Sequence, residues 1–175
     1  MESFVYPILP APRTAVLVPW FSRERSARHR FARNRHGSQS VCIFGGWGPD
    51  AAAFEPAAIA GTYEQLRALD LRAAPSLTHA LIVLSRPGEG RLKEENRDRL
   101  WRTFGVPVFE QIIGRSGELL AAECEAHDGL HVESPHLRVG HEYVDASPCP
   151  CGRKTPRFGG AQGTALLRRI AAYAR

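Results

Sequence analysis

The sequence predicts an α/β fold, in which a mixed sheet with a βαβ unit is followed by a strand-rich part clamped by a metal ion and a C-terminal helix. In the first two thirds of the chain, short apolar runs alternate with helical patterns, as in a parallel sheet with crossover helices. Shorter strand patterns follow from residue 119, among cysteine and histidine residues spaced like metal ligands. Apolar side chains then recur every three or four residues over 164–175, which is typical of an amphipathic helix.

Length and composition indicate a single globular domain. The chain has 175 residues, of which 43% are hydrophobic and 23% are charged. This is enough for one core and close to the average of globular proteins. Within the single domain 1–175 we expect a lead-in rich in proline and arginine (1–39), an α/β part (40–118), a zinc-clamped β part (119–158) and a C-terminal helix (159–175).

Two buried strands are expected before residue 45. Three prolines make residues 1–13 irregular or extended, because proline lacks the backbone donor that a helix needs. Residues 14–21 are apolar and β-branched, and they predict a strand that Pro19 interrupts or ends. Residues 40–44 predict the second strand. The glycine-rich turn that follows, 45–50, lacks the spacing of a phosphate-binding loop, so we do not expect it to hold a phosphate.

A βαβ unit is the clearest pattern in the middle of the chain. Residues 79–84 predict a strand, residues 93–104 a helix that Gly105 ends, and residues 106–113 another strand. Two strands joined in this way pair in parallel, and the helix covers one face of the sheet. Upstream, residues 56–71 predict a further helix from apolar side chains at helical spacing: Ile59, Tyr63, Leu66 and Leu69.

Four residues of the strand-rich part have the pattern of a zinc site. Strands are expected there over 119–124, 130–133 and 141–144. Cys149 and Cys151 form a C-x-C pair backed by a glycine, and the Asp-Gly turn after Cys124 would fold His131 back beside it. Zn²⁺ binds three sulfur atoms and one imidazole nitrogen tetrahedrally, and a filled shell leaves no position for water. We therefore expect a structural zinc ion at Cys124, His131, Cys149 and Cys151.

Other assignments of these residues stay open at this point. The alternative nitrogen ligands are His127, His136 and His141. Cys124 could instead be a core residue and the C-x-C pair incidental, since free cysteine is among the most buried residue types. Cys42 lies inside an apolar strand pattern, and we expect it in the core.

Hydropathy and charge narrow the classes of function. The longest apolar runs are far shorter than the roughly 20 residues of a membrane span, and the N-terminus lacks the pattern of a secretory signal. We therefore expect a cytoplasmic protein with reduced thiols. The net charge is +5, and residues 23–36 are rich in arginine. Arginine clusters can contact phosphates, but Phe31 is the only aromatic residue there for base stacking, so we expect a solvated helix face or loop.

The metal motif and the strand before it resemble phenylacetate–coenzyme A ligase. Residues 104–109 (Phe-Gly-Val-Pro-Val-Phe) precede 123–132 (Glu-Cys-Glu-Ala-His-Asp-Gly-Leu-His-Val) and 149–157 (Cys-Pro-Cys-Gly-Arg-Lys-Thr-Pro-Arg). In that family, a segment of the E-C-E-x-x-D-G-L-H-I kind precedes a C-x-C-G-R-x-x-P-R segment. The resemblance covers residues 80–158, and it implies the later part of the AMP-binding adenylation domain of an adenylate-forming ligase.

The resemblance also implies catalytic segments that this sequence does not match. An adenylate-forming ligase has a Ser/Thr/Gly-rich phosphate loop, an aromatic-Gly-x-Ser/Thr-Glu segment, a ribose-binding aspartate and a C-terminal domain with a catalytic lysine. The nearest match to the second is residues 112–118, which lack the aromatic residue and have one extra residue before the glutamate. Arg115, Ser116 and Glu118 are the remaining candidates for nucleotide contacts. Because most of these segments have no match, we expect a pseudoenzyme.

The sequence thus favours a zinc-binding, non-catalytic relative of the ligase that serves as a ligand- or protein-binding module. Its partner would be a protein, a second copy of the chain, or a small aryl, acyl or nucleotide ligand. One alternative is a minimal acyl- or aryl-adenylate-forming ligase that works with a partner subunit. Another is nucleic-acid binding through residues 23–36 and the basic C-terminal helix.

Overall fold

The described residues form one mixed sheet with three helices. The computed structural model describes residues 12–17, 30–32, 41–69, 76–115, 117–135, 137 and 144–159. The helices of this part are α1 (Pro49–Ala53), α2 (Tyr63–Arg67) and α3 (Glu94–Phe104). The strands are β1 (Thr14–Leu17), β2 (Arg30–Ala32), β3 (Val41–Phe44), β4 (Ala58–Gly61), β5 (Ala80–Ser85), β6 (Val108–Ile113), β7 (Leu119–Glu123), β8 (Leu130–Val132), β9 (Val144–Asp145) and β10 (Arg157–Phe158).

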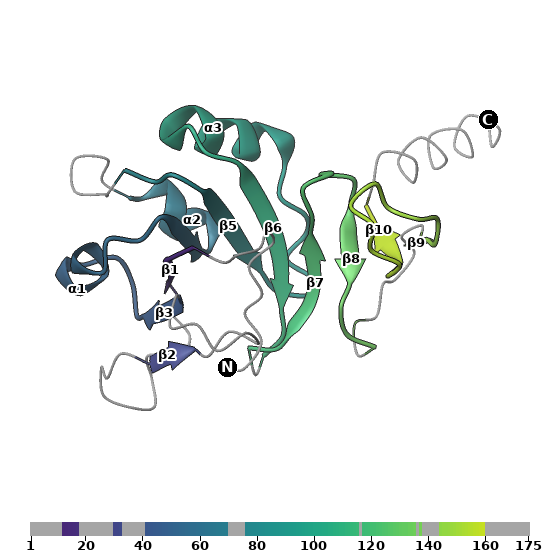
Figure 1. The fold of residues 1–175 in the computed structure, drawn as a ribbon, viewed down its shortest axis with the longest axis horizontal. Helices are drawn as coiled ribbons and strands as arrows, with labels where there is room; N and C mark the ends of the chain where they lie inside the picture. Colours follow the sequence, from purple (N-terminus) through teal and green to yellow (C-terminus); the bar gives the residue numbers. More distant parts are fainter. Residues whose placement is uncertain are drawn as a thin grey trace.

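The sheet has a parallel centre that is extended by antiparallel strands (Figure 1). The order across it is β2-β3-β1-β4-β5-β6-β7-β8-β10-β9. Strands β3, β1, β4, β5 and β6 run parallel. Strand β2 and the strands from β7 onward pair antiparallel with their neighbours. The crossover from β5 through α3 to β6 is the expected βαβ unit, so the predicted α/β fold class is confirmed.

Most of the expected elements are present with small shifts of their ends. Strands β1, β3, β5, β6, β7 and β8 lie within or across the predicted ranges. Helix α3 ends at Gly105, which has a φ of 67° and so adopts the left-handed conformation that glycine takes readily at a helix end. Strand β9 begins at Val144, where a strand was expected to end, and the short elements α1, β2 and β10 were not expected.

The helix predicted over residues 56–71 is wrong in its first half. Ala58–Gly61 is the strand β4, which pairs with β1 on one side and β5 on the other. A strand buried on both faces has a continuous apolar run without alternation, so its pattern does not distinguish it from a helix. The helix α2 begins only after Thr62, whose hydroxyl accepts from the Gln65 backbone N–H while the Gln65 side chain accepts from the Thr62 backbone N–H.

Several expectations lie outside the described residues. These are the irregular segment 1–11, the C-terminal helix over 164–175 and most of the arginine-rich segment 23–36. Residues 30–32 of that segment form β2 at one edge of the sheet, where a helix face or loop was expected. The division of the chain into four parts stays a prediction. In the part of the chain that the structure describes, no helix has the length and apolar character that a bilayer crossing requires.

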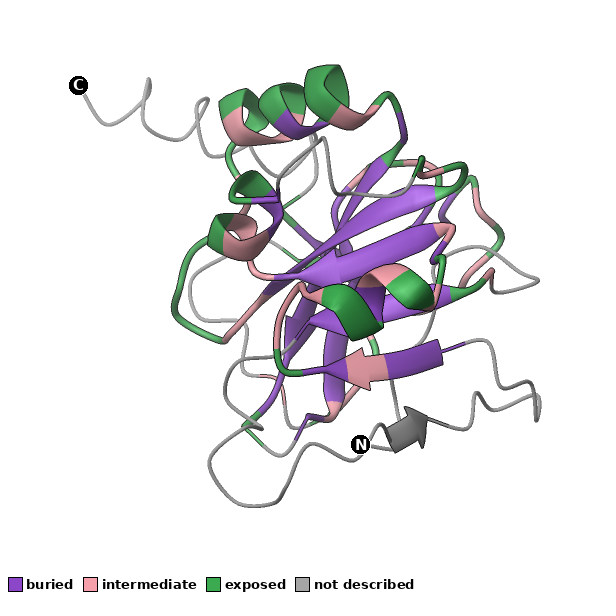
Figure 2. Ribbon diagram, turned by 90° about the vertical axis from the view of Figure 1, so that its left-hand side faces the viewer, coloured by how far each residue is buried: buried purple, intermediate pink, exposed green. Residues whose placement is uncertain are grey.

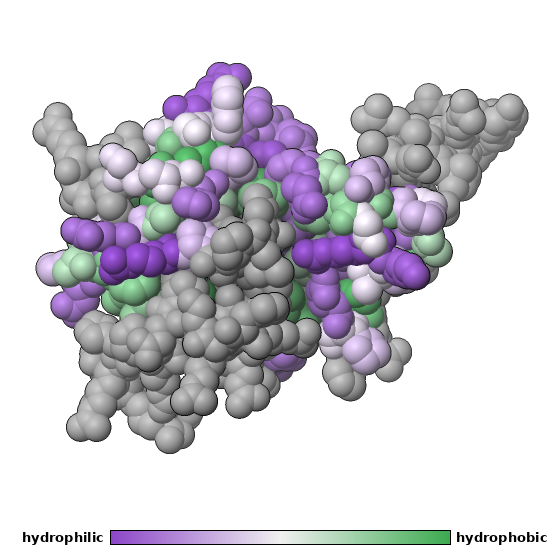
Figure 3. Space-filling view, viewed as in Figure 1, coloured by the Kyte–Doolittle hydropathy of each residue, from purple (hydrophilic) through white to green (hydrophobic). Residues whose placement is uncertain are grey.

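The two faces of the central sheet are covered by different elements. On one face, α1, α2 and α3 contribute Ala51, Leu66 and Leu100 to a cluster with strand residues. The cluster on the other face consists, among the described residues, of side chains from the strands alone. Figure 2 shows the central strands buried along most of their length and the helices with exposed residues. Hydrophilic side chains cover the outer side of α3 at the top of Figure 3.

The strand-rich end of the sheet has a smaller core. Its buried apolar cluster contains Ile112, Leu120, Ala121, Leu130 and Phe158, of which β8 and β10 supply only one residue each. Val132 and Leu137 pack against this cluster, which is still smaller than the two clusters of the central sheet. The four predicted metal ligands lie in this part of the fold.

Candidate metal centre

Strand pairing brings Cys124 and His131 to one face of the sheet. Strands β7 and β8 are antiparallel neighbours, and His131 is paired with Ala122. Side chains two residues apart on a strand point to the same face, so Cys124, directly after β7, continues the face on which His131 lies. The turn between the strands contains His127 and Gly129 with positive φ values of 50° and 83°. Glycine adopts such angles without strain, which explains why an Asp-Gly pair suits this turn.

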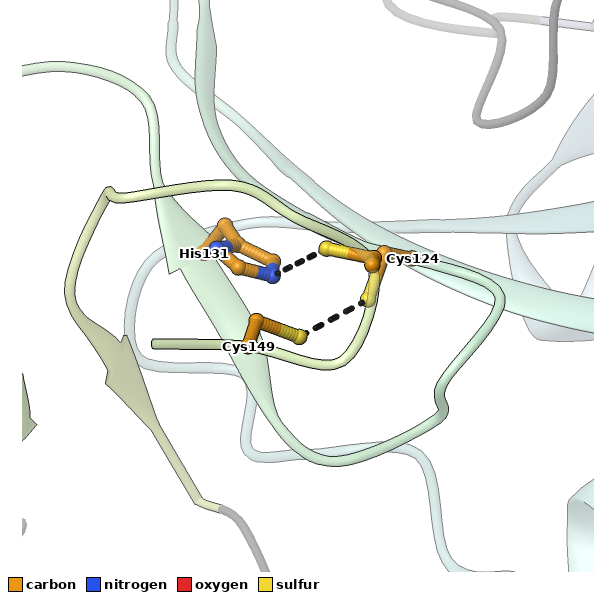
Figure 4. A group of neighbouring side chains, drawn as sticks. Cys124, His131 and Cys149 are labelled. Carbon is orange, nitrogen blue, oxygen red and sulfur yellow. Dashed lines mark hydrogen bonds between the residues drawn. The ribbon is translucent and has the colours of Figure 1, made fainter. Parts of the chain in front are cut away.

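The other two sulfur atoms come from a tight turn over residues 149–152, which we call the knuckle. The backbone N–H of Gly152 donates to the carbonyl oxygen of Cys149 over 2.9 Å. Gly152 has a φ of 81°, again in the left-handed region. The turn places both thiols on the side of β8, and Figure 4 shows Cys149 directed toward Cys124.

The four side chains form one compact cluster. The sulfur atoms of Cys124 and Cys149 are 3.6 Å apart, and Nε2 of His131 lies 3.5 Å from the sulfur of Cys151. All four ligand atoms lie within 4.8 Å of one another. Cys124 and His131 are fully buried, Cys149 is 5% exposed and Cys151 is partly exposed. A buried group of three thiols and one imidazole in this arrangement could hold a metal ion.

His131 is held in the tautomer that a metal ligand needs. Its Nδ1 lies 3.1 Å from the carbonyl oxygen of Thr155 and 2.9 Å from the Thr155 hydroxyl. A carbonyl oxygen can only accept, so Nδ1 carries the proton and Nε2 presents its lone pair to the sulfur atoms. Burial lowers the pKa of His131 below its usual value, which keeps the ring neutral at physiological pH.

The thiols differ in how readily they ionise without a metal. Burial raises the pKa of Cys124 to about 12, so this thiol stays protonated unless a positive charge is present. Burial also opposes ionisation of Cys149, but hydrogen bonds from the Cys151 backbone and neighbouring thiols, with the charge of Arg157, lower its pKa overall. A bound cation would supply the charge that a buried group of thiolates needs.

Arg157 connects the segments that carry the ligands. Its guanidinium is 3% exposed and donates to Asp128 in the turn between β7 and β8 over 2.8 Å. It also donates to Asp145 of β9 over 2.7 Å, and to the Ser147 hydroxyl two residues before Cys149. A guanidinium can bind several acceptors at fixed angles, so Arg157 sets the distance between the turn and the knuckle.

A buried polar network, not foreseen from the sequence, adjoins the cluster. The Glu123 carboxylate accepts from Arg97 of α3 over 3.1 Å, from the Glu110 backbone over 2.8 Å and from His127 over 3.2 Å. Glu110, fully buried, accepts from Arg91 over 2.9 Å, and Arg91 also donates to the Phe158 carbonyl in β10. The network joins α3 and the β5–α3 loop to the strand-rich part. The sequence signal for it is a charged residue in each of two apolar strands.

The remaining candidates occupy other places. His127 stacks on Phe109 with ring centres 4.9 Å apart and is not in the cluster, whereas His136 and His141 lie outside the described residues. Cys42 is in β3 with 2% exposure, consistent with the core position expected for it.

The described candidates for nucleotide contacts, Arg115 and Glu118, lie between β6 and β7. Arg115 is exposed there, and Ser116 lies outside the described residues. The carboxylate of Glu118 folds back against Gly114, where a Cβ atom on the glycine would meet it at 2.1 Å. The structure thus brings together the four predicted metal ligands.

Comparison with known proteins identifies the fold. No protein-family model matches the sequence, and no curated protein sequence matches it. Among solved structures, an open conformation of 2-hydroxyisobutyryl-CoA ligase in complex with 2-HIB-AMP and CoA matches with a TM-score of 0.52 and 16% identity. The match covers 86% of this chain and 44% of the ligase chain. At this identity the likeness shows the fold alone: the chain has the fold of part of this ligase and spans less than half of its length.

Proposed function

We propose that this chain is a zinc-stabilised, non-catalytic binding module built on part of the adenylate-forming ligase fold. The observation that carries the proposal is the closed cluster of Cys124, His131, Cys149 and Cys151, in which protein side chains supply all four ligands. A catalytic zinc site keeps one position open for water or substrate, and a structural site does not. The cluster lies where the core is smallest, which is where a structural ion contributes most to folding.

The distances within the cluster support zinc in particular. In a tetrahedral site with zinc bonds of about 2.3 Å to sulfur and 2.0 Å to nitrogen, two sulfur atoms are about 3.8 Å apart and a sulfur and a nitrogen about 3.5 Å. The corresponding distances here are 3.6 Å and 3.5 Å. Soft thiolate ligands with one imidazole also favour zinc over magnesium or calcium, which prefer oxygen.

The non-catalytic part of the proposal rests on the turn between β6 and β7. Transfer of an adenylyl group requires donors and a metal ion positioned around the phosphates. Here Glu118 folds onto Gly114, and Arg115 points to solvent in the turn. The described residues of this turn therefore offer only two charged side chains, Arg115 and Glu118, for that chemistry. We propose a partner protein, a second copy or a small carboxylate or nucleotide as the bound species.

A second candidate is a minimal ligase that acts with a partner subunit, and the fold favours it because the matched ligase binds an acyl-adenylate. The assay that separates the two is exchange of pyrophosphate into ATP in the presence of aryl and acyl acids. The binding module predicts no exchange above the buffer control. Exchange with any acid, reduced in Glu118→Gln, would reject the non-catalytic proposal.

Metal content tests the zinc clamp directly. Elemental analysis of freshly purified protein should give about one zinc ion per chain, as expected for one tetrahedral site. Cys124→Ser, His131→Ala and Cys151→Ser should each lose the metal and become more sensitive to proteolysis. Matched controls for zinc content are Cys42→Ser and His127→Ala, because these residues lie outside the cluster. Unchanged zinc content in the three ligand variants would reject the site.

A further inference from the structure

We propose that the cluster is also a peroxide-sensitive dithiol, in which oxidation joins Cys124 to the knuckle by a disulfide and releases the metal ion. This inference rests on the proposed function, since metal-bound thiolates are the reacting groups. The oxidised product contains no metal ion. A disulfide replaces the metal ion as the link between the two segments.

The three sulfur atoms differ in burial, so peroxide can reach the cluster at one of them. Cys124 is fully buried and Cys149 is 5% exposed, whereas Cys151 is partly exposed at the surface of the knuckle. Oxidants react with thiolates that they can reach, and a buried thiol remains inert. A small peroxide can therefore reach the cluster at Cys151 while the other two sulfur atoms remain shielded.

The positions of the sulfur atoms determine which bond can form. Cys124 follows β7 and Cys149 belongs to the knuckle, 25 residues later, yet their sulfur atoms are 3.6 Å apart. A disulfide needs a separation of about 2.0 Å, so a movement of less than about 2 Å by the two side chains suffices. The sulfur of Cys151 lies within 4.8 Å of both. No separation of β7 from the knuckle is required.

The oxidation balances with one molecule of peroxide. The thiolate of Cys151 attacks a peroxide oxygen, the O–O bond breaks, and a sulfenic acid and hydroxide form. The thiolate of Cys124 then attacks the Cys151 sulfur and expels a second hydroxide, giving a disulfide. Exchange with the thiolate of Cys149 moves this bond to the closest pair without further oxidation. The sulfur atoms lose two electrons, the two hydroxides take up protons to become water, and the metal loses two of its four ligands.

The disulfide would keep the strand-rich part closed after the metal leaves. It would link the end of β7 to the knuckle, the same two segments that the metal joins. A covalent cross-link of this kind restricts the unfolded chain and stabilises the folded one. The oxidised, metal-free protein is therefore folded between residues 119 and 159, whereas the reduced, metal-free protein is open there. A dithiol reductant with zinc should restore the starting form.

The experiment treats the zinc-loaded protein with one equivalent of hydrogen peroxide. We expect release of about one zinc ion per chain, as follows from loss of two of four ligands, measured with a colorimetric zinc indicator. Free thiols should fall by two, and peptide mapping by mass spectrometry should find Cys124 linked to Cys149 or Cys151. Protease resistance of residues 119–159 should persist after oxidation and be lost after removal of zinc under reducing conditions. Cys42→Ser, which alters the buried thiol outside the cluster, should behave like the unaltered protein.

Three results would overturn the inference: zinc retained after peroxide, a disulfide between Cys149 and Cys151 alone, or sulfinic acids in place of a disulfide. Metal content measured before peroxide is added tests the proposed zinc clamp separately. Protein that is purified without zinc rejects the clamp, whereas zinc that peroxide does not release rejects only the dithiol.

Discussion

At the scale of single residues, Thr155 determines how well His131 can act as a ligand. Its hydroxyl lies 2.9 Å from Nδ1 of His131, and its carbonyl oxygen lies 3.1 Å away. Thr155→Val removes the hydroxyl and leaves the carbonyl. Loss of such a partner lowers metal affinity by about 10-fold, so we expect the variant to bind zinc with full stoichiometry but reduced affinity. Competition with a zinc chelator measures this, and unchanged affinity would show that the carbonyl alone orients the ring.

Among the described ion pairs of the strand-rich part, we expect those of Arg157 to contribute most to stability. Arg157→Met leaves Asp128 and Asp145 without their buried partner, so we expect a loss of unfolding free energy that is larger than the loss from breaking an exposed pair. The matched control is Arg153→Met. Arg153 pairs with Glu133 at the surface, where a salt bridge contributes less than about 1 kcal/mol.

The measurement for this pair of variants is urea unfolding in the presence of excess zinc. If Arg157→Met loses no more unfolding free energy than Arg153→Met, then Arg157 does not connect the turn and the knuckle as described. Bound zinc stabilises the folded state by an amount that depends on its affinity, so the zinc affinity of both variants is measured as well and its contribution is subtracted before the unfolding free energies are compared.

At the scale of elements, the boundary between β4 and α2 depends on Thr62. Thr62→Ala removes the side chain that accepts from the Gln65 backbone N–H, and loss of such a cap costs about 1 kcal/mol. We expect this loss in the free energy of unfolding, measured with urea, and no change in zinc content. If residues 56–71 formed one helix, Thr62 would lie in its interior, and alanine would be neutral or stabilising.

Features that depend on residues close together in the chain could be predicted from the sequence. The four residues of the possible metal site could be placed together because their types and short spacing are typical of metal ligands, and α3 could be predicted because charged and apolar residues alternate at helical spacing up to Gly105. Zinc as the bound ion stays a prediction. Strand β4 was missed because a strand buried on both faces has no alternation. The contacts of Arg91 with Glu110 and of Arg97 with Glu123 depend on the order of strands in the sheet, which local patterns do not contain.

At the scale of the whole molecule, the network around Glu123 couples stability to pH. Burial opposes ionisation of Glu123, but His127, Arg97 and the Glu110 backbone together lower its pKa below the ordinary value of 4.5. A carboxylate with a lowered pKa stabilises the folded state above its unfolded pKa, and that stability is lost as pH falls through the folded pKa. The protein should therefore lose stability on acidification below about pH 4.5.

Glu123→Gln should weaken that dependence, because glutamine does not titrate. We expect the difference in unfolding free energy between the unaltered protein and the variant to be largest near neutral pH and to shrink below about pH 4.5. Urea unfolding followed by circular dichroism, with zinc in excess and the bound zinc measured at each pH, separates this effect from acid release of the metal. A difference that grows as the pH falls would contradict the assignment of Glu123 as an ionised, hydrogen-bonded group.

We propose that a metal ion completes the fold at the end of the sheet where the buried apolar cluster is smallest. The measurement that tests it most directly is X-ray absorption at the zinc edge of the purified protein. We predict a shell of three sulfur atoms at about 2.3 Å and one nitrogen at about 2.0 Å. A shell of nitrogen and oxygen atoms only, or reduced protein that folds fully without zinc, would contradict the account.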